Sequence, residues 1–213
     1  MSSKQATDRD EGTVAQRQCR DAYERAQLAW HNSPVSTYAQ RRATLKRLRS
    51  WILENQQRIA DTIHEDFQGR SKHETIMCEV FIANNAIKHT LTHLQSWMRQ
   101  EPRPVFWTFL PAKAKVIRQP LGVVGIISPW NYPFQLAVVP LIAAISAGNR
   151  VILKPSELTP KTSALIEEMC DAVFAQDEVI VVQGGADVGA AFSALPFDHL
   201  FYTGSTAVGR LVM

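Results

Sequence analysis

Residues 120–157 read PLGVVGIISPWNYPFQLAVVPLIAAISAGNRVILKPSE, and this stretch decides the fold. The run VVGIIS is rich in β-branched residues and predicts a buried strand, which the two prolines of SPWNYP end. The segment FQLAVVPLIAAISAG is apolar on almost every face and predicts a buried helix, and NRVILKPSE predicts a second short strand that ends in charge. A strand, a crossover helix and a second strand form a βαβ unit, which implies a parallel sheet.

Helices and strands continue to alternate after this unit. The sequence predicts a helix over 160–174, a buried strand over 178–183, a short helix over 187–194 and a strand over 198–203. Thr159 is a good N-cap residue, and Pro160 suits the first helical position. We therefore expect an α/β fold, in which a doubly wound, mostly parallel, Rossmann-like sheet follows a set of N-terminal helices.

The first half of the chain predicts those helices. Residues 1–13 are polar and expected to be flexible, and apolar stripes predict helices over 14–30, 36–64 and 71–98. A connector rich in proline and aromatic residues, EPRPVFWTFLPAK, follows, and AKAKVIRQP over 112–120 predicts a strand. We expect a helical segment over 14–110 and a nucleotide-binding α/β domain over 111–213.

Three features of this half allow more than one interpretation. Phe106, Trp107 and Phe109 could form a membrane or partner patch, but the family resemblance described below implies that the connector packs between domains. The basic run RRATLKRLR could bind an anion, but a solvated helix face explains it better. His89 and His93 are spaced i, i+4 on one helix without a third ligand nearby, so we expect no metal site.

The amino-acid composition and net charge argue against several classes of protein. The chain has 213 residues, 46% of them hydrophobic and 20% charged, and its net charge of +3 is spread without a concentrated basic patch, which argues against nucleic-acid binding. Three cysteines without metal spacing or a disulfide framework suit a reducing, cytoplasmic compartment. The polar N-terminus is no signal peptide, and the most apolar run, 136–147, is too short to span a bilayer.

Three motifs occur in the order of a known family. PWNYP at 129–133, LKPSE at 153–157 and FYTGSTAVG at 201–209 resemble the motifs of the aldehyde dehydrogenase superfamily, and the resemblance is strongest to class 3-like and coniferyl aldehyde dehydrogenases. It implies NAD(P)-dependent oxidation of an aldehyde, with coniferyl aldehyde as the preferred substrate and medium- or long-chain aliphatic aldehydes as the alternative. It also implies a homodimer for the full-length form.

The resemblance assigns cofactor roles to residues at the strand ends. Lys154 and Glu157 would hydrogen-bond the adenine ribose, and the Glu157 carboxylate would repel a 2′-phosphate, favouring NAD over NADP. The alternative is an ordinary surface pair of opposite charges. Ile127 and Trp130 would line the cofactor cleft, and Gly185 would lie near the adenine.

The turn after the last strand would hold the pyrophosphate. Gly204 and Ser205 start a helix, whose free N–H groups suit an anion, and Gly209 permits close packing one turn later. The alternative is that Ser205 only caps its own helix.

Asn131 is the catalytic candidate. In the family reaction a cysteine thiolate attacks the aldehyde carbon, and the Asn131 side-chain amide would stabilise the resulting oxyanion. The alternative is a turn asparagine without a chemical role.

The family's nucleophilic cysteine and its general-base glutamate are absent from the motifs of this chain. Cys19, Cys78 and Cys170 lie in predicted helices away from those motifs, and we expect them to be core thiols. We therefore expect the 213-residue chain alone to be inactive and poorly soluble. Two alternative interpretations of the chain remain: a nucleotide-binding module without catalysis, and a structural remnant that binds neither cofactor nor aldehyde.

Overall fold

The computed structural model describes residues 13–32, 35–175 and 177–213. The predicted flexible segment 1–13 therefore lies outside the described residues, apart from Thr13. The α-helices are α1 (Val14–Asn32), α2 (Tyr38–Glu54), α3 (Gln56–Asp66), α4 (Lys72–Thr75), α5 (Phe81–Trp97), α6 (Pro133–Ala147), α7 (Pro160–Val173), α8 (Ala186–Ser193) and α9 (Thr206–Val212). The strands are β1 (Glu101–Arg103), β2 (Ala114–Val116), β3 (Val123–Ile127), β4 (Arg150–Lys154), β5 (Val179–Val181) and β6 (His199–Tyr202).

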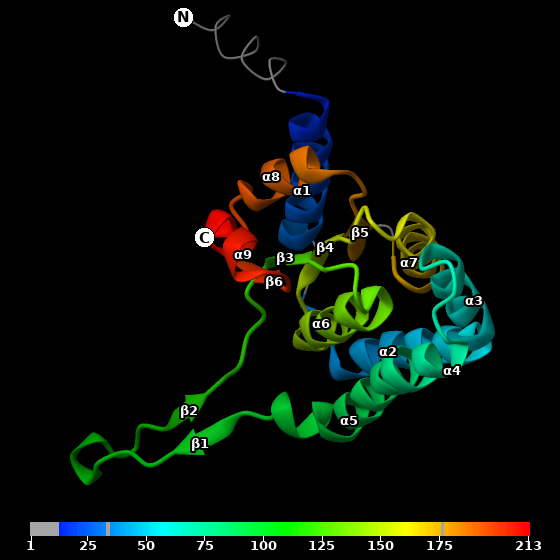
Figure 1. The fold of residues 1–213 in the computed structure, drawn as a ribbon. Helices are drawn as coiled ribbons and strands as arrows, with labels where there is room; N and C mark the ends of the chain where they lie inside the picture. The colour runs from blue at the N-terminus through cyan, green and yellow to red at the C-terminus, as the bar shows by residue number, and fades with distance from the viewer. Residues whose placement is uncertain (1–12, 33–34, 176) are drawn as a thin grey trace, which may run out of the picture.

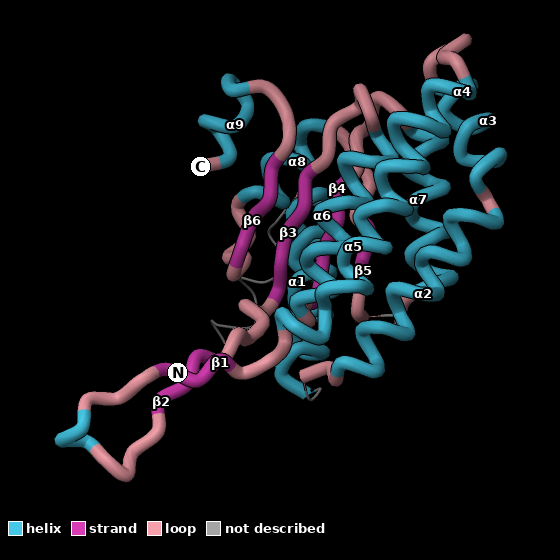
Figure 2. The backbone as a smooth tube through the Cα atoms, turned by 90° about the horizontal axis from the view of Figure 1, so that it is seen from below, coloured by secondary structure: helices cyan, strands magenta, loops and turns pink. Residues whose placement is uncertain are grey.

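Four parallel strands form the central sheet in the order β5-β4-β3-β6 (Figure 2). The chain winds outward from β3 to β4 and β5, and then crosses back to place β6 on the other side of β3. This arrangement confirms the predicted doubly wound α/β fold. The strand order reverses beside β3, which is where ligands bind in sheets of this type.

Helices cover both faces of the sheet (Figure 1). α1 and α8 pack on one face, where alternate strand residues such as Val123, Ile152 and Ile180 point. α6 and α7 pack on the other face, against Val124 and Leu153.

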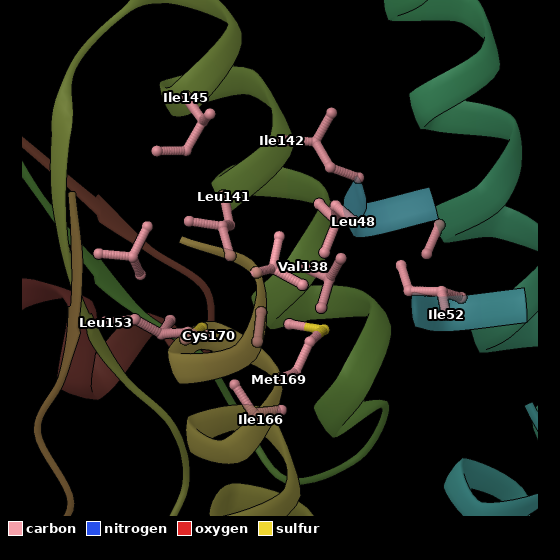
Figure 3. Packing of buried hydrophobic residues seen from close by; sticks show 14 of the residues in the cluster. Leu48, Ile52, Val138, Leu141, Ile142, Ile145, Leu153, Ile166, Met169 and Cys170 are labelled. Carbon is pink, nitrogen blue, oxygen red and sulfur yellow. The ribbon is translucent and has the colours of Figure 1, made fainter. Parts of the chain in front are cut away.

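Three of the N-terminal helices, α2, α3 and α5, form a further layer outside α6 and α7. α2 and α5 pack against α6, and α3 packs against α7. Figure 3 shows the shared core, in which Leu48 of α2, Leu141 of α6 and Met169 of α7 lie together, fully or almost fully buried. α2, α3 and α5 therefore cover the faces of α6 and α7 that point away from the sheet.

The predicted helix over 36–64 is two helices. The break lies at Asn55, whose side-chain amide donates to the main-chain carbonyl of Trp51 at 2.9 Å. An asparagine side chain that binds nearby backbone competes with the helix ladder, which explains the break. The predicted helix over 71–98 is interrupted by the π-helical turn Ile76–Val80, which joins α4 to α5.

The connector does not pack between domains in the described structure. β1 and β2 pair antiparallel and form a hairpin that projects away from the sheet in both views (Figures 1 and 2). The side chains of Phe106, Trp107 and Phe109 at its tip are 64–71% exposed. The predicted strand over 112–120 is limited to β2, because its only partner within the described chain is the short, proline-containing β1.

Among the described residues, no helix combines the length and the apolar character that crossing a bilayer requires.

Candidate active site

The carboxyl ends of three neighbouring strands bring the sequence motifs to one edge of the sheet. The parallel register places Ile127 of β3 level with Lys154 of β4 and Tyr202 of β6. The loops that carry PWNYP, PSE and TGS follow directly after these three residues. Segments that are far apart in the sequence therefore meet at the ligand-binding edge expected for a doubly wound sheet.

Lys154 and Glu157 form an ion pair across the turn after β4. The Lys154 side chain is 5% exposed, and its Nζ donates to Glu157 Oε2 at 3.0 Å and to the Pro155 carbonyl at 3.3 Å. Glu157 is 43% exposed. Burial raises the pKa of Glu157, but a main-chain hydrogen bond and Lys154 outweigh this and leave that pKa below 4.5. Glu157 therefore presents an ionised acceptor at neutral pH.

These residues line a cavity of about 700 Å³. Four of the predicted cofactor residues meet there, namely Ile127, Lys154, Glu157 and Gly185. Ser128 also lines it, and the buried Ser128 Oγ has no partner among the described residues. The Lys154 ammonium can donate hydrogen bonds, the Glu157 carboxylate can accept them, and the Ser128 hydroxyl can do both. Together these groups fit a ribose and its neighbouring polar groups.

Glycines keep one wall of this cavity open. Gly185 is the N-cap of α8, and a Cβ there would lie 3.2 Å from Asp187 Oδ1. A Cβ on Gly189 would approach Lys154 Cε at 3.5 Å. Side chains at these positions would occupy part of the cavity that the two glycines leave open, so the wall suits a ligand that lies close to α8.

The turn after β6 lies at a neighbouring cavity of about 600 Å³ on α9, lined by Gly204, Ser205 and Gly209. Ser205 is the N-cap of α9, and its Oγ accepts from the Val208 N–H at 3.3 Å, so the capping alternative describes one of its roles. The hydroxyl proton is still available to a ligand. A Cβ on Gly204 would lie 2.1 Å from Tyr202 Oη, which explains the glycine.

Trp130 and Asn131 line neither of these two cavities. Trp130 is 50% exposed, and its ring centroid lies 6.1 Å from that of Phe67. The Asn131 side chain is exposed, whereas its main-chain carbonyl accepts a hydrogen bond from Arg70 Nη1 at 2.5 Å. The structure thus separates Asn131 from the residues that line the cavity of about 700 Å³, although both lie at the same edge of the sheet.

Sequence reasoning missed two charged residues behind Asn131. Arg70 and Glu79 come from the N-terminal helical segment, and Glu79 is completely buried against the start of α6. The sequence signal available was weak: a glutamate beside the apolar stripe of a predicted helix. The main-chain groups that both side chains bind lie more than fifty residues further along the chain.

Two of the three cysteines are buried as the sequence predicts, and Cys78 is not fully buried. Cys19 and Cys170 are buried, and burial raises the pKa of both thiols. Cys78 is partly buried in the π-helical turn. Raised thiol pKa values oppose formation of the thiolate that a nucleophile needs, so Cys19 and Cys170 are core thiols. Within the described ranges, no group of three or more His, Cys, Asp or Glu side chains is arranged to hold a metal ion.

A family model, described as the aldehyde dehydrogenase family, matches residues 6–213. The chain belongs to the aldehyde dehydrogenase family. It is 44% identical over 191 residues to a probable coniferyl aldehyde dehydrogenase of Pseudomonas aeruginosa, covering 90% of this chain and 40% of the relative. It is 46% identical over 173 residues to a coniferyl aldehyde dehydrogenase of Pseudomonas sp. strain HR199, covering 81% of this chain and 36% of the relative.

Solved structures of this family share the fold. The substrate-bound state of Staphylococcus aureus AldH matches with a TM-score of 0.86 and 31% identity, covering 91% of this chain and 42% of that one. An Escherichia coli NADP-dependent enzyme matches with a TM-score of 0.82 and 27% identity, covering 93% of this chain and 41% of that one. The chain spans about two fifths of the length of the aldehyde dehydrogenases that it matches.

Proposed function

We propose that the intact protein oxidises an aldehyde to the carboxylic acid with NAD(P), and that coniferyl aldehyde or a similar aromatic aldehyde is its substrate. The observation that carries this proposal is the cavity lined by Lys154, Glu157 and Gly185 at the same sheet edge as Asn131. Family membership supports the reaction, and the names of the two Pseudomonas relatives support the substrate class.

The cavity residues would bind and orient the cofactor, whose nicotinamide supplies the hydride acceptor when it is bound. Lys154 and Glu157 would hydrogen-bond the adenine ribose, and Ser128 Oγ is available as a further partner. The ionised Glu157 would disfavour a 2′-phosphate, so we propose NAD as the preferred cofactor. The remaining cofactor contacts are proposed for Ile127, Trp130, Gly185, Gly204, Ser205 and Gly209.

Asn131 would donate its side-chain amide to the oxyanion that forms when a thiolate attacks the aldehyde. A neutral amide suits this role because it donates without titrating near neutral pH, and its side chain is exposed at the edge. Cys19 and Cys170 are buried with raised pKa values, and no cysteine of the described chain lines either cavity at this edge. We therefore propose, with the family resemblance, that the nucleophile and the general base belong to a part of the protein outside these 213 residues.

The test is a comparison of substrates with the intact protein. We expect aldehyde-dependent NADH formation with a higher kcat/KM for coniferyl aldehyde than for a medium- or long-chain aliphatic aldehyde. The reverse preference would support the aliphatic alternative. NAD binding without turnover of either aldehyde would refute the enzymatic proposal and favour a non-catalytic nucleotide-binding module. A homodimer and a cytoplasmic location are further proposals, which light scattering and cell fractionation test.

A further inference from the structure

The start of α6, directly after Asn131, is capped by a side chain from another element. Tyr132 at the N-cap makes no side-chain capping bond, and Pro133 at the first helical position has no N–H. The next two N–H groups, of Phe134 and Gln135, both donate to Glu79 Oε2, at 2.8 and 3.1 Å. Glu79 thus takes the place of a local cap.

Arg70 holds the other side of the same loop. Its Nη1 donates to the Asn131 carbonyl at 2.5 Å and lies 3.5 Å from Glu79 Oε1. Its guanidinium lies between two aromatic rings, 4.3 Å from the centroid of Tyr132 and 5.0 Å from that of Phe67. The main chain is therefore fixed both at Asn131 and immediately after Pro133, while the Asn131 side chain stays exposed.

Burying the Arg70–Glu79 pair costs more free energy than forming an ion pair at the surface. The Arg70 and Glu79 side chains are 8% and 0% exposed, and Arg70 Nε has no partner among the described residues. Burial raises the pKa of Glu79, while the two N–H donors and Arg70 oppose that rise. Glu79 also lies in the π-helical turn Ile76–Val80, and such turns are frequent at functional sites.

A second capping site shows what ordinary capping looks like in this chain. α7 also starts with a proline, and Thr159 makes no side-chain capping bond despite its favourable position. The Asp66 carboxylate caps α7 instead, accepting from the Lys161 and Thr162 N–H groups at 3.1 and 2.7 Å. The hydrogen bonds of the Asp66 carboxylate go to Lys161 and Thr162 and not to Asn131, so Asp66 is a capping carboxylate that does not hold the loop.

We propose that Arg70 and Glu79 are positioning residues, which hold the main chain around Asn131 so that its amide reaches the reacting centre in one orientation. This inference rests on the proposed oxyanion role of Asn131. An oxyanion donor must be held to within about 0.5 Å of its productive position, and a displacement of about 1 Å can cost roughly a hundredfold in rate.

The experiment measures kcat, the Kd for NAD and thermal stability of the intact protein in matched variants. Glu79→Gln and Asp66→Asn both replace a capping carboxylate by its amide. Both should lower stability, Glu79→Gln more, because it leaves the buried Arg70 without its carboxylate partner. We expect kcat to fall about ten- to a hundredfold in Glu79→Gln only, with the Kd for NAD changed less than about twofold. Hydrogen exchange at the Phe134 and Gln135 amides should accelerate in Glu79→Gln and not in Asp66→Asn.

Arg70 variants keep the inference testable if Glu79→Gln folds poorly. Arg70→Met should lower kcat by a similar factor, and Arg70→Lys should recover part of it, because lysine keeps the charge but lacks the planar fork. Equal kcat values in all four variants and the wild type, with a strongly impaired Asn131→Ala, would overturn the positioning role alone. An unimpaired Asn131→Ala would instead overturn the oxyanion role, and the positioning role with it.

Discussion

Replacing Glu157 by glutamine tests whether its charge sets the choice of cofactor. The side chain is 43% exposed, and it accepts from the buried Lys154 ammonium at 3.0 Å. Glutamine keeps one acceptor oxygen, removes the charge and replaces the second oxygen by an NH2 donor. The variant therefore tests the effect of the charge while one acceptor oxygen is still present at this wall of the cavity.

The size of the effect follows from two terms. A hydrogen bond to a charged group contributes about 1.5–3 kcal/mol and a neutral one about 0.5–1.5, so the affinity for NAD should fall about tenfold. Repulsion between the partly solvated carboxylate and a 2′-phosphate is on the order of 1 kcal/mol per pair of charges, so the affinity for NADP should rise about fivefold. The ratio of the two Kd values should therefore change by about fiftyfold.

The assay is calorimetric titration of the intact protein with each cofactor. Glu65→Gln is the matched control, because Glu65 forms an exposed pair with Lys161 at 2.8 Å, and neither residue lines the cofactor cavity. The control should change neither Kd. Equal changes for both cofactors in Glu157→Gln, or changes below about twofold, would refute the electrostatic reasoning.

The same variant has a defined effect on stability. Because Glu157 is more than a third exposed, its loss should cost no more than about 1 kcal/mol at neutral pH. Burial raises the pKa of Glu157, but a main-chain hydrogen bond and Lys154 leave it below its ordinary value in the folded protein. This contribution is therefore fully present above the unfolded-state pKa and is lost as the pH falls through the folded-state pKa. Chemical denaturation of both proteins across this range should show the difference shrinking on acidification.

Two further predictions concern the scaffold. Alkylation of the native protein, followed by peptide mass spectrometry, should modify Cys78 well before Cys19 and Cys170, because only Cys78 is accessible without unfolding; equal rates would contradict the assignment of core thiols. Gly122→Ala should destabilise the protein by about 1–3 kcal/mol more than Gly69→Ala. Both glycines have a φ near +140°, so both variants carry the same backbone strain. Only a Cβ at Gly122 would clash with the Asp198 carboxylate, which accepts a hydrogen bond from the Val123 N–H. Equal midpoints of denaturation in the two variants would contradict this comparison.

The sequence was informative where local pattern decides the structure. β-branched runs predicted β3 and β4, and the apolar segment between them predicted α6 with its buried faces. Because parallel strands share one carboxyl edge, the motifs that follow them could be placed together in advance. Lys154 contacts Glu157, and Ser205 contacts its own helix, so both contacts are equally local. For this reason the sequence alone indicated both residues as candidates.

Features that depend on distant partners could not be predicted. The caps of α6 and α7 come from Glu79 and Asp66, which lie more than fifty residues earlier in the chain. No sequence motif at the start of either helix could therefore predict them. The sequence favoured Thr159 as a cap, and the structure satisfies those N–H groups from another helix instead. The connector illustrates the same point, since whether its aromatic residues are buried depends on which surfaces lie within their reach, and the described chain leaves them exposed.

The most direct test of the central claim is the turnover of the intact Asn131→Ala variant with coniferyl aldehyde. The oxyanion role predicts a kcat lower by about a hundred- to a thousandfold, with the Kd for NAD unchanged, because the cavity lined by Lys154 and Glu157 does not include Asn131. A kcat equal to that of the wild type would contradict the proposed chemistry of this edge of the sheet.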